Sequence, residues 1–242
     1  MTNGANRNWA RRPDTRILLS GLIVFSALAA FAYVASEVLE GYPLAIDRWL
    51  LLRLRLVADP GVSVGPRWLL QVMVDLTALG GGTVLTLVAV FVTLYLAARR
   101  KVALAVFVLS SIAAGGVLTA VLKTLFARAR PDIVPHLVEV SSASFPSGHA
   151  MNSAMVYLTG AALLASAEPS RRVRIFLVSA ALALTLAIGF SRVFLGVHFP
   201  TDVLGGWAIG IAWAVAASWA AAILQRRQAI EGGEGTTTST AA

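Results

Sequence analysis

Long apolar runs separated by short polar segments make up most of the chain. A helix needs about 20 mostly apolar residues to cross the hydrocarbon core of a bilayer. Six segments reach or approach this length: residues 17–36, 68–98, 102–122, 147–166, 175–195 and 201–224. The pattern predicts an all-α protein, a polytopic membrane helical bundle with six transmembrane helices.

The second run, residues 68–98, is too long for one straight span. Three consecutive glycines at residues 80–82 interrupt it, and glycine weakens a helix interior. We therefore predict a short entry helix that carries Asp75, followed by a span over residues 83–98.

Polar segments flank and divide the membrane domain, which we expect over residues 17–224. Residues 1–16 are predicted to form a cytosolic N-terminal arm, and residues 225–242 a cytosolic disordered tail. The first run resembles a signal peptide, but it is longer than a usual h-region and no small-residue cleavage site follows, so an uncleaved helix is expected. The connection over residues 37–67 is placed outside the membrane, with one short helix in the interface and its role left open.

Composition excludes several classes of protein. Hydrophobic residues make up 57% of the chain and charged residues 13%, against roughly 25% charged residues in soluble domains. A free-standing soluble enzyme is therefore excluded. The chain contains no cysteine, which excludes disulfides, thiolate metal sites and a cysteine nucleophile.

The net charge of +8 falls on one side of the predicted bundle. Six spans put both termini on the same side, which carries twelve Lys or Arg and four Asp or Glu residues, whereas the other side carries eight of each. The positive-inside rule then predicts cytosolic termini in the cell (inner) membrane. Topology and attraction to anionic lipid explain the positive charge, so no nucleic-acid partner is expected.

Polar residues gather at three helix ends, all on the non-cytosolic side. The segments are residues 123–131, 145–149 and 191–202. They place the cations Lys123, Arg130 and Arg192, two histidines and one carboxylate at one membrane depth. Charged groups near hydrocarbon cost roughly 2.5–3.5 kcal/mol each, so such a cluster indicates a functional site.

Taken singly, these residues also have structural interpretations. Lys123 and Arg130 could be interfacial anchors that snorkel to the headgroups. Ser147 could be only the N-cap of the following helix. His149 could be a buried histidine with a satisfied hydrogen bond.

Similar interpretations apply to the remaining polar residues. Arg192 could form a structural ion pair with Asp202. His136, in the polar loop, is expected to be structural. Arg128 is expected to be structural too, although it lies two residues before Arg130 and so near the site.

Together the three segments supply the parts of a metal-free phosphoryl-transfer site. Lys123, Arg130 and Arg192 offer the positive donors that phosphate oxygens need. Ser147 and Gly148 open a helix whose free N–H groups attract an anion, and glycine lets the backbone approach closely. The sequence has no clustered Asp and Glu ligands for a two-metal site, so no metal and no cofactor are expected.

A covalent route needs a nucleophile that is neutral near pH 7, and an imidazole qualifies. His198 and Asp202 are four residues apart and could meet across a helix start, where the carboxylate would fix the tautomer and stabilise the cation that forms. The second histidine, His149, could protonate the leaving oxygen.

The three segments resemble the signature of the type-2 phosphatidic acid phosphatase superfamily. The matching motifs are K-x6-R-P at Lys123–Pro131, P-S-G-H at Pro146–His149 and S-R-x5-H-x3-D at Ser191–Asp202. That superfamily includes membrane lipid phosphate phosphatases, bacterial polyprenyl pyrophosphate phosphatases, glucose-6-phosphatase and soluble vanadium haloperoxidases.

The resemblance implies a role for each site residue. His198 would attack phosphorus to give a phosphohistidine, Asp202 would orient His198, and His149 would protonate the leaving group and later activate water. Five further residues would hold the phosphoryl oxygens: Lys123, Arg130, Ser147, Gly148 and Arg192.

We therefore expect an integral membrane, metal-independent lipid phosphatase whose site faces the periplasm or exterior. Its expected partners are a lipid phosphate substrate and the bilayer, with no obligate protein partner. A site at the interface suits an amphiphile whose headgroup lies at that depth. A polyprenyl diphosphate such as undecaprenyl diphosphate is favoured, because the compact chain has no evident extra recognition module. Phosphatidylglycerol phosphate and phosphatidate come next.

Three alternatives are open at this point. A protein of the same fold could bind or move lipid phosphates without hydrolysis, although the catalytic set is complete. A transporter or channel could use the cations as an anion path, but no internal repeat is seen. A haloperoxidase-like activity with bound vanadate is disfavoured by the membrane spans, although vanadate should inhibit as a phosphate mimic.

Overall fold

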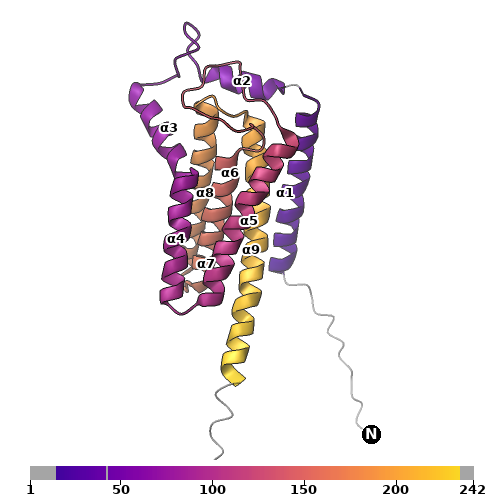
Figure 1. Ribbon diagram of the computed structural model, residues 1–242, viewed down its shortest axis with the longest axis vertical. Helices are drawn as coiled ribbons and strands as arrows, with labels where there is room; N and C mark the ends of the chain where they lie inside the picture. Colours follow the sequence, from indigo (N-terminus) through magenta and orange to yellow (C-terminus); the bar gives the residue numbers. More distant parts are fainter. Residues whose placement is uncertain (1–14, 42, 235–242) are drawn as a thin grey trace, which may run out of the picture.

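The computed structural model describes residues 15–41 and 43–234 of the chain, and every regular element among them is helical. The helices pack side by side into one bundle (Figure 1). The all-α prediction is therefore confirmed. The elements follow in the order α1 (Thr15–Leu39), α2 (Ala45–Arg53), α3 (Arg67–Leu79), α4 (Gly82–Ala98), α5 (Val102–Phe126), α6 (Gly148–Ser153), the π-helical turn η1 (Ala154–Leu158), α7 (Thr159–Ala167), α8 (Arg171–Phe194) and α9 (Pro200–Glu234).

Five spans in the described residues are long and apolar enough to cross a membrane, and a bent pair adds a sixth. The pair is α3 and α4, which meet at an angle of 46° across the predicted glycine break. One of the five spans is composite, because α6, η1 and α7 run on from one another over Gly148–Ala167. Six spans result when the bent pair is counted as one, in agreement with the sequence pattern.

The outer surface of the bundle is apolar. Phe25, Phe91 and Phe176 are 71%, 67% and 68% exposed, and many other large apolar side chains on the spans share this exposure. A soluble monomer rarely carries such continuous apolar surface, whereas lipid chains cover it at no cost. The exposure therefore fits a bundle immersed in a bilayer.

Helix α9 is the central element and presents a seam of glycines to α6. A Cβ atom at Gly206 would lie 2.7 Å from the carbonyl oxygen of Ser147, and one at Gly210 would lie 2.8 Å from that of Met151. Small residues let helix backbones approach closely inside a membrane. The seam therefore brings the two predicted catalytic helix starts against each other.

Two helices run beyond their expected ends. Helix α5 continues to Phe126, so Lys123 lies within its last turn rather than after it. Helix α9 continues to Glu234 and projects past the other helices (Figure 1). This differs from the disordered tail expected from residue 225, and the reason is the helix-forming composition of the Gln, Arg, Ala and Glu residues there. The predicted arm over residues 1–16 lies almost wholly outside the described residues.

The short interfacial helix expected between residues 37 and 67 is α2. It lies across the end of the bundle, above the start of α9 (Figure 1). Buried Leu51 of α2 packs in one core cluster with Phe199 and Val203. Arg55 follows α2 and donates to the carbonyl oxygens of Phe194 and Pro135 at 2.8 and 3.4 Å. The segment is thus fastened to the helix ends that carry the predicted motifs.

Candidate active site

The three predicted segments meet around an open pocket of about 430 Å³ at the same end of the bundle as α2. Its wall also includes the bend between α3 and α4 and the loop over residues 138–142. Six of the predicted residues line it: Lys123, Arg130, Gly148, His149, Arg192 and His198. The other two, Ser147 and Asp202, are fully buried next to it.

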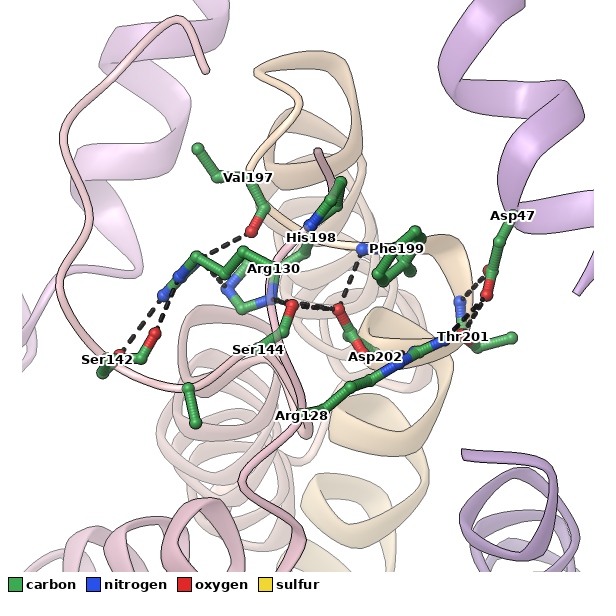
Figure 2. Close-up of polar contacts among 12 residues, drawn as sticks. Asp47, Arg128, Arg130, Ser142, Ser144, Val197, His198, Phe199, Thr201 and Asp202 are labelled. Atoms are coloured by element: carbon green, nitrogen blue, oxygen red, sulfur yellow. Dashed lines mark hydrogen bonds and ion pairs between the residues drawn. The ribbon is translucent and has the colours of Figure 1, made fainter. Parts of the chain in front are cut away.

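His198 lies in the short connection between α8 and α9, and its neighbours Val197 and Phe199 are buried. Its Nδ1 lies 3.4 Å from Oδ2 of Asp202, and its Nε2 lies 3.3 Å from Nη1 of Arg130 (Figure 2). A carboxylate beside Nδ1 and a donor beside Nε2 both favour the tautomer with its proton on Nδ1. Burial lowers the pKa of His198 to about 4. At neutral pH the ring is therefore uncharged, and the Nε2 lone pair points toward the pocket.

Asp202 occupies the first turn of α9 and is held from three directions. Its Oδ2 accepts hydrogen bonds from the Phe199 N–H at 2.8 Å and from the Ser144 hydroxyl at 2.5 Å. Its Oδ1 forms a 2.6 Å ion pair with Nη1 of Arg128. The ion pair that Arg192 could have formed with Asp202 is not found, because Arg128 occupies this position. The expectation that Arg128 lies near the site is met.

Lys123 and Arg130 donate hydrogen bonds to backbone carbonyl oxygens around the pocket. Nζ of Lys123 donates to the carbonyl oxygen of Ala143. Arg130 donates from Nη1 to Val197 and from Nε to Ser142, at 2.5 and 2.7 Å, and burial lowers its pKa. These contacts tie the loop over the pocket to the helix ends that carry the predicted motifs.

Arg192 approaches from the last turn of α8. It is buried, and its Nη1 donates to Oγ1 of Thr77 at 2.8 Å, while its Nε has no hydrogen-bond partner among the described residues. Thr77 belongs to α3, so the bent pair contributes to the site. The guanidinium thus keeps donor capacity for a ligand in the pocket.

The start of α6 borders the pocket with Gly148, and Ser147 is buried next to it. The Ser147 backbone N–H donates to the Asp202 carbonyl at 2.9 Å, but its buried hydroxyl makes no cap bond and has no partner in the described part of the chain. The N-cap interpretation therefore does not explain this hydroxyl. A Cβ atom at Gly148 would lie 3.4 Å from Cε of Lys123, so the α6 backbone and the lysine side chain are neighbours at the pocket.

His149 faces the pocket from α6, beside the glycine bend between α3 and α4. Its ring nitrogens have no hydrogen-bond partner among the residues that the structure describes. The structure therefore does not support the interpretation of His149 as a buried histidine with a satisfied hydrogen bond. By contrast, Nε2 of His136 lies 2.8 Å from the Pro131 carbonyl, as expected for a structural residue.

Several residues at the site were not found by sequence reasoning. Thr77 and Asn152 are polar residues within apolar helices, and such residues are a signal for a site. Ser144 and Asp47 carry no comparable local signal, because they lie in polar segments. Within residues 15–41 and 43–234, no three His, Cys, Asp or Glu side chains come together as potential metal ligands.

The helices that build the site match known proteins. The PAP2 superfamily profile matches residues 104–226. Phosphatidylglycerophosphatase B of Bacillus subtilis is 36% identical over 158 residues, which are 64% of this chain and 76% of the relative. Undecaprenyl-diphosphatase of Sulfolobus acidocaldarius is 37% identical over 67 residues, 28% of each chain. The crystal structure of a transmembrane PAP2-type phosphatidylglycerolphosphate phosphatase from Bacillus subtilis aligns with a TM-score of 0.71 at 31% identity, covering 80% of this chain and 93% of that one.

Proposed function

The chain belongs to the PAP2 superfamily, and we propose that it removes the terminal phosphate of a membrane lipid through a phosphohistidine on His198. Its phosphatidylglycerophosphatase and undecaprenyl-diphosphatase relatives are hydrolases of lipid phosphates, and this chain is one as well. The observation that carries the proposed mechanism is the neutral, buried His198, with Asp202 behind Nδ1 and the pocket before Nε2.

In the first step Nε2 of His198 attacks phosphorus, and the bond from phosphorus to the lipid oxygen breaks. His149, when protonated, gives its proton to that leaving oxygen. Asp202 stabilises the positive charge that forms on the His198 ring. In the second step a water attacks phosphorus, neutral His149 accepts its proton, and the bond between nitrogen and phosphorus breaks to release inorganic phosphate.

The cradle for the phosphoryl oxygens combines side chains and backbone. Lys123, Arg130 and Arg192 supply positive donors, which stabilise the negative charge on the phosphoryl oxygens in the transition state. The partnerless hydroxyl of Ser147 and the N–H of Gly148 complete the set at the start of α6. Lys123, Arg130 and Arg192 are held by hydrogen bonds to the protein before the substrate arrives, which reduces the reorganisation that the reaction requires.

Phosphatidylglycerol phosphate is the substrate that we propose first. The supporting observation is the 36% identity to phosphatidylglycerophosphatase B over 76% of that relative. Undecaprenyl diphosphate, which the sequence alone favours, is the second candidate, because the undecaprenyl-diphosphatase match spans only 67 residues. Phosphatidate is the third.

Phosphate release by the detergent-purified protein tests this proposal. We expect release in EDTA, with the highest kcat/KM on phosphatidylglycerol phosphate in a panel that includes undecaprenyl diphosphate, phosphatidate and p-nitrophenyl phosphate. If EDTA abolished phosphate release and added metal restored it, the metal-independent mechanism would be contradicted. If folded protein released no phosphate from any of the lipids, the alternative of a non-catalytic binding or transport protein would be favoured.

We also propose that both termini are cytosolic and that the pocket faces the periplasm or exterior. The charge asymmetry between the two ends of the bundle supports this orientation. A topology reporter fused after residue 230 is expected to read the cytosol, and one inserted within residues 132–144 the exterior. The opposite pair of readings would overturn the orientation.

A further inference from the structure

Helix α2 carries a carboxylate that is fully buried although the helix lies outside the spans. Asp47 is 0% exposed. Its Oδ1 accepts a hydrogen bond from the Thr201 N–H at 2.9 Å, and its Oδ2 accepts one from the Thr201 hydroxyl at 2.7 Å. Asp47 therefore supplies an acceptor to an N–H group in the first turn of α9, where the helix itself has none.

Asp47 also reaches the catalytic carboxylate through one guanidinium. Nη2 of Arg128 lies 3.2 Å from Oδ2 of Asp47, and Nη1 of the same side chain lies 2.6 Å from Oδ1 of Asp202 (Figure 2). The guanidinium carbon stands 4.3 Å from the ring centre of Phe199, which limits its sideways movement. Arg128 is thus clamped between two buried carboxylates.

We call the arrangement of Arg128 between Asp47 and Asp202 the clamp. The clamp determines which carboxylate oxygen of Asp202 faces His198. Because Arg128 occupies Oδ1 of Asp202, the other oxygen, Oδ2, is directed to the Phe199 N–H, the Ser144 hydroxyl and Nδ1 of His198. A rotation of the carboxylate would break several of these contacts at once. The orientation of His198 therefore depends on the position of Arg128.

Charge balance gives the clamp a second effect. Arg128 alone would neutralise Asp202, but Asp47, Arg128 and Asp202 together carry a formal charge of −1 at pH 7. His198 becomes positive as the phosphohistidine forms, and the pocket already holds the cations of Lys123, Arg130 and Arg192. A net negative cluster behind the ring opposes that accumulation of positive charge.

We infer that Asp47 is a positioning residue for the phosphatase reaction, which acts through Arg128 and the first turn of α9 to hold Asp202 against His198. The inference rests on the proposed function. It also gives a role to the segment between α1 and α3, which the sequence left open. Asp47 does not line the pocket, so its effect must reach the reaction through its neighbours.

Asp47→Asn tests the inference, because asparagine fills the same space and can still accept from the Thr201 N–H. We expect kcat to fall about 10- to 100-fold, as when a group that orients a catalytic ligand is lost, while KM changes by less than about threefold. The matched control is Asp59→Asn. Asp59 is exposed in the turn after α2, and its Oδ1 accepts only from the Gly61 N–H at 2.9 Å, a bond that asparagine retains. This control is expected to keep wild-type kcat and KM.

A double-mutant cycle shows whether Asp47 acts through Arg128. In the Arg128→Gln background, Asp47→Asn is expected to lower kcat by less than about threefold, because the path to Asp202 is already broken. Full additivity of the two losses, or wild-type kcat in folded Asp47→Asn, would overturn the inference. The thermal unfolding midpoint in detergent is measured for every variant.

Asp47→Glu covers the case in which Asp47→Asn does not fold. It keeps the charge beside Arg128 and is expected to retain at least about a tenth of wild-type kcat. A folded Asp47→Glu protein with less than about a hundredth of wild-type kcat would contradict the charge argument. If wild-type protein releases no phosphate from any lipid, the proposed function fails; if only the variants disagree, the role of Asp47 alone fails.

Discussion

His198→Ala is expected to reduce phosphate release about 10³-fold or more, because no other side chain can replace the nucleophile. The ring is buried and its Nε2 faces the pocket, so the covalent step depends on this one nitrogen. Turnover of phosphatidylglycerol phosphate in detergent measures the loss. When the wild-type reaction is stopped without acid, which would hydrolyse a phosphorus–nitrogen bond, a phosphoramidate on the protein should be detectable. In His198→Ala it should be absent.

The matched control is His136→Ala, a second histidine in the same half of the chain. Among the described residues its ring has one hydrogen-bond partner, the Pro131 carbonyl, and its loss removes one hydrogen bond worth about 1 kcal/mol. We expect wild-type turnover from this variant. Activity of His198→Ala above a few per cent of wild type would show that His198 is not the nucleophile.

His149→Ala is expected to lower turnover by about 10²- to 10⁴-fold, the range for loss of a general acid or base. The size of the loss should depend on the leaving group. A lipid alcohol leaves poorly without a proton, whereas p-nitrophenolate leaves well without one. The first step of p-nitrophenyl phosphate cleavage should therefore suffer much less than that of phosphatidylglycerol phosphate.

The two steps can be separated by burst kinetics. With p-nitrophenyl phosphate, His149→Ala should form the phosphoenzyme and then hydrolyse it slowly, because the same residue activates water. A burst of p-nitrophenol equal to the amount of enzyme is the expected result. Equal losses on both substrates, without a burst, would remove His149 from the proton transfers. Folding should be unaffected, because the His149 ring makes no hydrogen bond within the described residues.

The bundle and the pocket-lining residues could be predicted from the sequence because both leave strong local signals. Runs of apolar residues reveal spans one by one. Charged residues at the ends of such runs are costly unless they serve a site. Lys123, His149 and Arg192 stand out for this reason before any distance is known, and the structure brings all three to one pocket.

The supporting contacts could not be predicted, because they join segments far apart in the chain. Asp47 and Arg128 are 81 residues apart, and Arg192 and Thr77 are 115 apart. Asp47 is one of several charged residues between the first two spans, and Thr77 is a polar residue in an apolar helix, but neither position identifies its partner. Only the folded chain makes the pairs, by placing the loop after α5 beside α2 and by packing α3 on α8.

The C-terminal end of α9 could not be located from the sequence for a different reason. Helix α9 continues past the apolar span to Glu234, because helix propensity does not require hydrophobicity. Hydropathy locates where a span leaves the membrane, but it does not locate where the helix stops. The expected tail boundary at residue 225 followed the first of these signals.

The glycine seam between α6 and α9 has a consequence for protein engineering. Gly206 and Gly210 set the spacing of the two helices, and those helices carry the proposed proton donor His149 and the carboxylate Asp202. Filling such seams with larger side chains is an attractive route to a more detergent-tolerant membrane protein. In this chain it would move His149, the proposed general acid, away from His198, the proposed nucleophile. Stabilising libraries should therefore leave these two positions fixed and vary the lipid-facing surface instead.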